Sequence, residues 1–144
     1  MSLAIRDGTP DDAELLAPAF AALGYPAEPA TVRARLTAML TDDRTARLLV
    51  AEVAGGVVGF ATLHETPMPH RPTPVGRITA IAVLDSARGT GAGRALVETA
   101  EEHFRSRGIA RVEVTSGENH AAAHAFYRHI GYADNGLRFS KALT

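Results

Sequence analysis

A glycine-rich turn between an apolar strand and a helix constrains the fold of this chain more than any other stretch. The segment 77–83 is rich in apolar residues and predicts a buried strand, and apolar residues recur at helical spacing after the turn. Gly89, Gly91 and Gly93 allow positive φ and a close approach to a ligand. Amide groups in the first turn of a helix have no partners within it, so the turn is suited to bind an anion, pyrophosphate especially.

Two familiar phosphate-binding motifs do not match this turn. A P-loop requires lysine after its last glycine, and Arg94 stands there. A dinucleotide-binding fingerprint requires Gly-x-Gly-x-x-Gly, and neither Gly89 nor Gly91 begins such a pattern. The turn does match Arg-x-x-Gly-x-Gly, from Arg88 to Gly93. In this pattern, directly after a strand, it resembles the acyl-coenzyme A loop of the GNAT superfamily of N-acetyltransferases.

A second segment, 116–132, carries the strongest resemblance to the same superfamily. It contains Asn119, an alanine-rich stretch that predicts a helix, the pair Phe126 and Tyr127, and a Gly-Tyr ending. This order is similar to the closing motif of GNAT enzymes, especially in a bacterial subgroup that acts on small molecules or has no assigned substrate. The resemblance covers roughly residues 45 to 143, and more loosely the whole chain.

The resemblance implies an α/β (α+β) GNAT fold, a central mixed, twisted sheet of about six to seven strands flanked by about four helices. The residue pattern itself predicts strands over 3–6, 47–53, 57–64, 77–83, 109–116 and 137–142, and helices over 10–23, from about Pro29, after the glycine turn, and from Asn119 to Gly131. The strand, turn, helix and next strand form a βαβ unit, which requires parallel pairing. The proline-rich segment 65–75 is either a loop that covers substrate or an ordinary long hairpin loop.

Composition limits the class of protein. A length of 144 residues predicts one domain, 1–144, and 46% hydrophobic with 22% charged residues is ordinary for a soluble globular protein. A net charge of −1 gives no general attraction to nucleic acid or to an anionic membrane, and no apolar run approaches the roughly 18 residues of a membrane span. The absence of cysteine suits a cytoplasmic location. His120 and His124 alone do not make a metal site, so no metal is expected.

Acetyl transfer from a thioester to an amine needs a deprotonated amine, a polarised carbonyl and a proton for the departing thiolate. The resemblance assigns proton donation to Tyr127, whose phenol is protonated at neutral pH because its ordinary pKa is about 10. Ile81, Ala82 and Val83 are implied to pair with the pantetheine arm and polarise the thioester through their backbone amides.

The resemblance also implies a pyrophosphate site in the glycine turn. It would be formed by the backbone amides of Gly89, Gly91, Gly93 and Arg94 and by the guanidinium group of Arg88. Asn119 either contacts the pantetheine or acts as a helix N-cap.

The sequence departs from the family pattern at the position that supplies the general base in many relatives. Many relatives carry a carboxylate on the strand before the loop, but here Thr79 and Ala80 stand there. The candidates for the general base are Glu113, His120, Glu65, His64 and a chain of water molecules.

These observations predict an N-acetyltransferase that uses acetyl-coenzyme A and a primary amine in a ternary complex. A small-molecule acceptor is expected over a protein or peptide amine, and no nucleic-acid or membrane partner is expected. The alternative is a non-catalytic acyl-coenzyme A sensor, which the missing strand carboxylate favours. A homodimer is expected because dimers are common among similar proteins.

Overall fold

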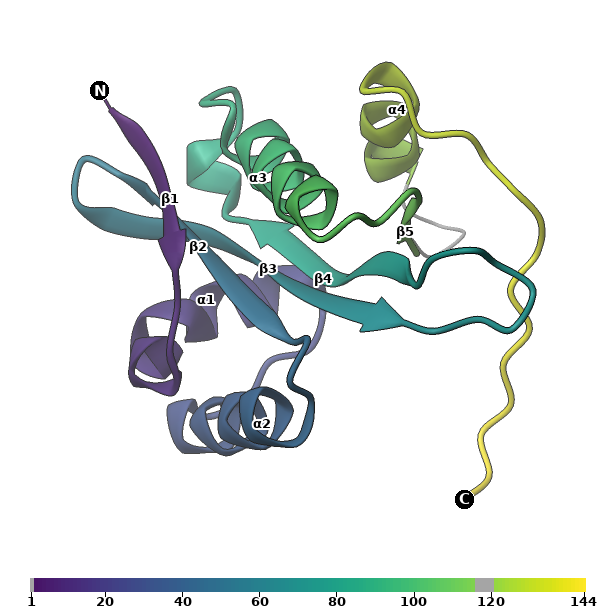
Figure 1. Cartoon of the computed structure of the whole chain (residues 1–144). Helices are drawn as coiled ribbons and strands as arrows, with labels where there is room; N and C mark the ends of the chain where they lie inside the picture. Colours follow the sequence, from purple (N-terminus) through teal and green to yellow (C-terminus); the bar gives the residue numbers. More distant parts are fainter. Residues whose placement is uncertain (1, 116–120) are drawn as a thin grey trace.

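A five-stranded sheet forms the centre of the computed structural model, which describes residues 2–115 and 121–144 (Figure 1). Its strands follow one another in chain order: β1 (Leu3–Asp7), β2 (Arg47–Val53), β3 (Gly56–Thr66), β4 (Val75–Val83) and β5 (Val112–Val114). The first four are antiparallel to their neighbours, and β5 pairs in parallel with the start of β4. The parallel pairing expected for the βαβ unit is therefore confirmed.

Four α-helices cover the two faces of the sheet. They are α1 (Ala13–Leu23), α2 (Pro29–Asp42), α3 (Ala92–Ser106) and α4 (Ala121–His129), with short 3-10 turns at η1 (Pro10–Asp12) and η2 (Asp85–Ala87). Helices α1 and α2 lie on one face, and α3 and α4 lie on the other (Figure 1). The arrangement is the α/β architecture that the resemblance implies, with a mixed sheet between two helical layers.

Strand alternation divides the core between these two layers, because successive side chains point to opposite faces of a sheet. Toward α1 and α2, Phe60 of β3 stacks on Phe20 with ring centroids 4.4 Å apart. Toward α3, Leu63 of the same strand packs in one cluster with Leu96 and Phe104. Each layer therefore has its own apolar cluster, and the sheet contributes to both.

Two polar contacts fix the beginning of the first helical segment. Thr9 accepts a hydrogen bond from the Asp11 amide, and Asp12 accepts one from the Thr9 amide at 2.9 Å, so Thr9 caps this segment. Asp12 also accepts hydrogen bonds at 2.7 and 3.1 Å from Arg6 of β1, which in turn pairs with Glu52 of β2. The cap thus joins the helical layer to the sheet.

The predicted strand over 137–142 is wrong. Residues 133–144 contain no helix or strand and are all exposed. A strand needs a neighbour that accepts and donates its backbone hydrogen bonds, and none lies beside this segment in the described part of the chain. The described sheet therefore has five strands instead of about six to seven, and β5 is shorter than the predicted 109–116.

The proline-rich segment connects β3 to β4. The ends of these strands pair up to Thr66 and Val75, so the connecting loop is 67–74.

Among the described helices, none is long and apolar enough to cross a lipid bilayer.

Candidate functional site

The glycine turn leads from β4 into the N-terminus of α3. Gly89 and Gly91 have φ of +79° and +83°, and Gly91 is the cap residue of the helix. The hydroxyl of Thr90 donates to the Ala87 carbonyl at 2.6 Å and accepts from the Ala92 amide at 3.3 Å, which holds the turn closed. A residue with a side chain would be strained at either glycine because positive φ is unfavourable for L-residues.

Four backbone amides of this turn find no acceptor within residues 2–115 and 121–144. They belong to Gly89, Gly91, Gly93 and Arg94. The first intrahelical bond of α3 begins only at Ala95, whose amide donates to the Gly91 carbonyl at 2.9 Å. These N–H groups and the positive end of the helix dipole are suited to hold an anion.

The two arginines of the predicted loop are engaged with carboxylates. Arg88 donates from Nε to Asp85 at 3.1 Å, and Arg94 donates from Nε to Glu98 at 2.9 Å. Both ion pairs are exposed to solvent. A guanidinium group has five N–H donors, so the remaining donors of Arg88 are available to a phosphate group.

The end of β4 exposes backbone groups beside this turn. The Leu84 amide donates to the Val58 carbonyl of β3, and backbone groups alternate in direction along an antiparallel strand. Ala82 therefore bonds toward β3, and Ile81 and Val83 direct their amide and carbonyl groups to the opposite side. Of the three predicted residues, these two have backbone groups that can reach a ligand.

On that opposite side, β4 has a partner only at its beginning. Pairing with β5 covers Gly76 to Ile78, and the described residues offer β4 no further partner after that point. Within residues 2–115 and 121–144, therefore, the length of β4 directly before the glycine turn is unpaired on this side.

Helix α4 packs above the start of α3 and places Tyr127 near the same region. A Cβ on Gly93 would lie 3.6 Å from the Phe126 ring and 3.8 Å from Val83, so α4, the turn and β4 meet there. The ring of Tyr127 stands edge-on to that of Phe126, with centroids 5.4 Å apart. Burial raises the pKa of the Tyr127 phenol, which therefore keeps its proton at neutral pH. Its hydroxyl makes no hydrogen bond to the described residues.

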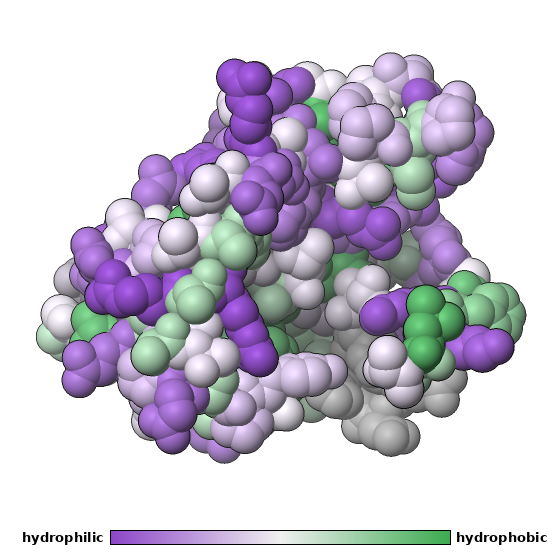
Figure 2. All heavy atoms as spheres, turned by 90° about the horizontal axis from the view of Figure 1, so that it is seen from below, coloured by the Kyte–Doolittle hydropathy of each residue, from purple (hydrophilic) through white to green (hydrophobic). Residues whose placement is uncertain are grey.

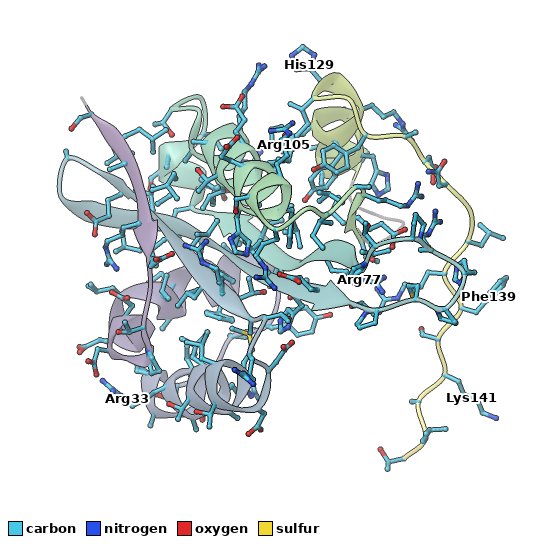
Figure 3. All side chains as sticks on the ribbon, viewed as in Figure 1. Arg33, Arg77, Arg105, His129, Phe139 and Lys141 are labelled. Carbon is cyan, nitrogen blue, oxygen red and sulfur yellow. The ribbon has the colours of Figure 1, made fainter. Side chains whose placement is uncertain are left out.

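Tyr127 also lines a pocket of about 890 Å³ between α3, β5, α4 and the C-terminal residues. Its apolar lining includes Phe104, Ile109, Ile130 and Tyr132. Its charged lining includes five arginines, Arg77, Arg105, Arg111, Arg128 and Arg138, with Glu101, Glu113 and Asp134. Arg77 and Arg105 are labelled in Figure 3.

Two of the carboxylates predicted as general-base candidates are held by arginines. Glu65 accepts hydrogen bonds from Arg107 at 2.8 and 3.3 Å, and its side chain is only 7% exposed. Glu113 accepts from Arg111 at 2.9 Å and lies 3.7 Å from Arg77. Neither carboxylate is free to accept a proton from a substrate without losing an ion pair.

His64 is placed differently, because a carboxylate orients its ring. Its Nδ1 lies 2.8 Å from Asp43 at the end of α2, and Thr45 donates two further hydrogen bonds to Asp43. The bond from His64, with those from Thr45, lowers the pKa of Asp43 to about 2. An ionised Asp43 accepts the Nδ1 proton, so Nε2 of the neutral ring is an acceptor. Among the described residues, nothing bonds to that Nε2.

The position of the missing carboxylate is a bulge. The register of β3 with β4 shifts between Thr62 and Leu63, which leaves Thr79 as an extra residue on β4. The Thr79 hydroxyl lies 2.8 Å from the hydroxyl of Thr62. Neither this pair nor Asp43 was predictable from the sequence, because neither lies in a local motif.

Two predicted residues, Asn119 and His120, lie outside the described residues. Within the described part of the chain, no group of three or more His, Cys, Asp or Glu side chains could hold a metal ion.

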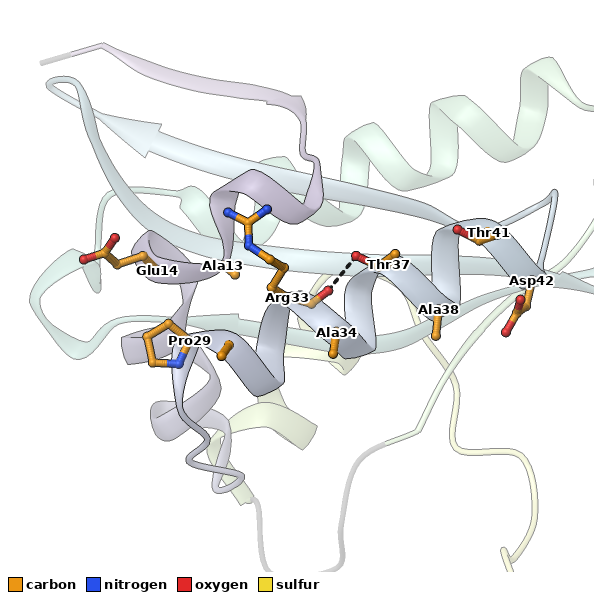
Figure 4. A pocket seen from close by; sticks show the side chains of 10 residues that line it. Ala13, Glu14, Pro29, Arg33, Ala34, Thr37, Ala38, Thr41 and Asp42 are labelled. Carbon is orange, nitrogen blue, oxygen red and sulfur yellow. Dashed lines mark hydrogen bonds between the residues drawn. The ribbon is translucent and has the colours of Figure 1, made fainter.

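A separate hollow of about 740 Å³ lies between α1 and α2 (Figure 4). Small side chains of α2 line it, including Ala34 and Ala38, with Glu14, Arg33 and Asp42 also at the hollow. The hydroxyl of Thr37 donates to the Arg33 carbonyl at 2.8 Å. None of the predicted site residues lies in this hollow, so it is distinct from the glycine turn.

Comparison with known proteins supplies the context for this geometry. Over 89 residues the chain is 36% identical to an aminoalkylphosphonate N-acetyltransferase of Salmonella typhimurium, and the match covers 62% of this chain and 58% of that protein. Over 88 residues it is 35% identical to a mycothiol acetyltransferase of Thermobispora bispora, covering 60% of this chain and 30% of that protein. The chain therefore matches little more than half of the first relative and less than a third of the second.

Solved structures share the fold over the whole chain. A ribosomal-protein-alanine N-acetyltransferase from Brucella melitensis biovar Abortus superposes with a TM-score of 0.82 at 22% identity, covering 99% of this chain and all of that one. An aminoglycoside acetyltransferase from an uncultured soil sample superposes with a TM-score of 0.78 at 23% identity, covering all of both chains. At such identities the likeness establishes the fold alone.

The model of one family matches most of the sequence. It extends over residues 13–132, from the start of α1 to the tyrosine that follows α4. This range includes the glycine turn, the unpaired end of β4 and Tyr127. The chain belongs to the acetyltransferase (GNAT) family.

Proposed function

We propose that this chain transfers the acetyl group of acetyl-coenzyme A to the primary amine of a small molecule, by direct attack within a ternary complex. The observation that carries the proposal is the set of four unpartnered amides at the start of α3, directly beside the unpaired end of β4. These groups match the two parts of such a donor, because a pyrophosphate needs several N–H donors and an amide-containing arm needs a free strand edge.

In this proposal the chain stabilises the charge on the carbonyl oxygen, donates a proton to the thiolate and removes a proton from the amine. The amine nitrogen attacks the thioester carbon, a C–N bond forms, and the C–S bond breaks. Backbone amides of Ile81 and Val83 stabilise the negative charge that develops on the carbonyl oxygen. Tyr127 donates its proton to the departing thiolate, which the raised pKa of its phenol permits.

We assign the removal of the amine proton to His64. Its ring is oriented by Asp43 at 2.8 Å, and its Nε2 has no partner among the described residues. Leu63 packs in the α3 layer, so His64 faces the α1 and α2 layer, opposite to the side that α3 and α4 cover. The proposed base and the proposed acid thus lie on opposite sides of the sheet.

The proposed acceptor is a small amine because the first two relatives are named for small molecules, an aminoalkylphosphonate and mycothiol. We also propose a homodimer, since large apolar side chains of the C-terminal segment lie in solvent. A cytoplasmic location is proposed because the chain contains no cysteine.

A non-catalytic sensor of acyl-coenzyme A is the competing function, favoured by Thr79 in place of a carboxylate.

The test is release of free coenzyme A thiol from acetyl-coenzyme A in the presence of a panel of small amines that includes aminoalkylphosphonates. Tyr127→Phe is expected to lower kcat about 100-fold or more, with little change in the Kd for acetyl-coenzyme A, because only the donated proton is removed. The activity of the unmodified chain is expected not to decline through ionisation of Tyr127 below about pH 10.

Two outcomes would contradict this assignment. Binding of acetyl-coenzyme A with no thiol release for any amine would favour the sensor. An active enzyme whose kcat is unchanged in Tyr127→Phe would show that another group donates the proton.

A further inference from the structure

Four polar side chains of β3 and β4 lie together on the face of the sheet where α1 and α2 pack. The register pairs His64 with Arg77, and directly opposite residues of an antiparallel pair point to the same face. Thr62 lies two positions before His64 and therefore shares this face. The hydroxyl groups of Thr62 and Thr79 are 2.8 Å apart. The proposed base, a guanidinium group and two hydroxyl groups thus form one polar area, made of Thr62, His64, Arg77 and Thr79.

The guanidinium group of Arg77 is only weakly engaged by the protein. Its ion pair with Glu113 of β5 has an N–O distance of 3.7 Å, which is too long for a hydrogen bond. Glu113 accepts a hydrogen bond at 2.9 Å from Arg111 instead. The Arg77 side chain is 36% exposed and makes no hydrogen bond to residues 2–115 or 121–144. Its N–H donors are therefore available to a ligand, and their planar fork matches a carboxylate or a phosphonate.

The surroundings of Arg77 offer space and positive charge. Arg77, Arg111 and Glu113 line the pocket of about 890 Å³, so two cations and one anion border it at this point. Asp43, on the other side of His64, already accepts hydrogen bonds from His64 and Thr45. Figure 2 views the molecule from the side of α1 and α2, where hydrophilic side chains are more widespread than hydrophobic ones. A small anion can therefore reach Arg77 without entering the apolar core.

We propose that the acceptor amine carries an anionic group, a carboxylate or a phosphonate, which Arg77 binds while the amino group lies at Nε2 of His64. The inference rests on the proposed function, in which His64 removes the proton of the amine. The Cβ atoms of directly opposite residues are about 4.5–5.5 Å apart, so a ligand with two or three carbon atoms between its amino and anionic groups can contact both side chains. Arg77 recognises the substrate and takes no part in the proton transfer.

The same guanidinium group disfavours amines that lack an anionic group. Most primary amines are protonated at neutral pH, and an ammonium group at His64 would lie beside the positive charge of Arg77. An anionic group on the substrate neutralises that charge and so removes the repulsion. Specificity then comes from attraction for one class of amine together with repulsion of the other.

The test compares matched amines in the thiol-release assay, β-alanine against β-alaninamide and 2-aminoethylphosphonate against propylamine. The unmodified chain is expected to acetylate the anionic member of each pair with a kcat/KM about 10-fold or more above that of the uncharged member. Arg77→Gln is expected to raise KM for the anionic amines about 10- to 100-fold with little change in kcat, because it removes binding that is equal in the ground state and the transition state. The kcat/KM for β-alaninamide should be unchanged or higher in Arg77→Gln, which also shows that the variant is folded.

Arg33→Gln is the matched control, because Arg33 is an exposed arginine of α2 that pairs with Asp11 and borders the hollow between α1 and α2. It should leave KM for all four amines unchanged. A rise in KM for the anionic amines in Arg33→Gln, with none in Arg77→Gln, would place the anion in that hollow and overturn the inference. Acetylation of amines without an anionic group alone would also overturn it and leave the proposed function standing. Binding of acetyl-coenzyme A without thiol release for any amine would overturn the proposed function and the inference together.

Discussion

His64 and Tyr127, the proposed base and acid, lie on opposite sides of the sheet. Tyr127 lies in the short helix α4, on the α3 side of the sheet. His64 lies on β3, and the residue before it, Leu63, faces α3. The role of Tyr127 stays a prediction of the family resemblance, which rests on the pair Phe126 and Tyr127 within the alanine-rich helix α4. The bond of His64 to Asp43 could not be predicted, because it joins residues 21 positions apart and depends on where α2 ends against β3.

His64→Gln is expected to lower kcat/KM for amine acetylation about 100-fold, the usual contribution of a general base. The amide retains a donor toward Asp43 but cannot accept the amine proton at neutral pH. His70→Gln, on the exposed loop between β3 and β4, is the matched control and should retain full activity. Steady-state kinetics of the two variants provide the comparison. Equal activity in both would mean that the proton leaves by another route, water included.

At the scale of elements, the sequence predicted most helices and strands because each has its own periodicity and end signals. Thr9 caps the first helical segment, which begins at Pro10, and glycine lies in the hairpin between β2 and β3. The segment 137–142 has an equally good strand pattern and forms no strand. Propensity is local, whereas a strand depends on a partner that sequence alone does not place.

The Arg6 and Asp12 pair joins three elements, and its loss is expected to weaken their packing. Asp12→Asn should lower the free energy of unfolding by about 1.5–3 kcal/mol, the range for hydrogen bonds to charged groups. Glu98→Gln, in the exposed pair with Arg94, is the control and should cost at most about 0.5 kcal/mol. Urea denaturation at one protein concentration measures both. A smaller loss in Asp12→Asn than in Glu98→Gln would contradict the role assigned to this pair.

The ion pair of Asp12 also predicts how the stability of the fold depends on pH in the acid range. The hydrogen bonds from Arg6 lower the pKa of Asp12, so the folded state favours its ionised form. Its stabilising contribution is therefore present above the unfolded pKa of about 3.9 and is lost as the pH falls below that value. The unmodified chain should lose stability more steeply than Asp12→Asn below about pH 4.

At the scale of the whole molecule, the sheet separates the proposed donor site from the proposed general base. The glycine turn, the free end of β4 and α4 meet on the α3 side, where the donor is proposed to bind. His64 and Asp43 lie on the side of α1 and α2. The family was predictable from contiguous motifs, whereas the layer that each side chain faces depended on strand register and on the bulge at Thr79.

The most direct measurement of the central claim is thermal melting of the chain with acetyl-coenzyme A, with ATP as the comparison ligand. At about 100 times its Kd, acetyl-coenzyme A should stabilise the fold by roughly 2.7 kcal/mol and raise the Tm by a few degrees. Gly93→Asp should abolish the shift because its carboxylate repels the pyrophosphate, while the isosteric Gly93→Asn should retain much of it. A shift that is equal with ATP, or unchanged in Gly93→Asp, would contradict the assignment of the glycine turn as the donor site.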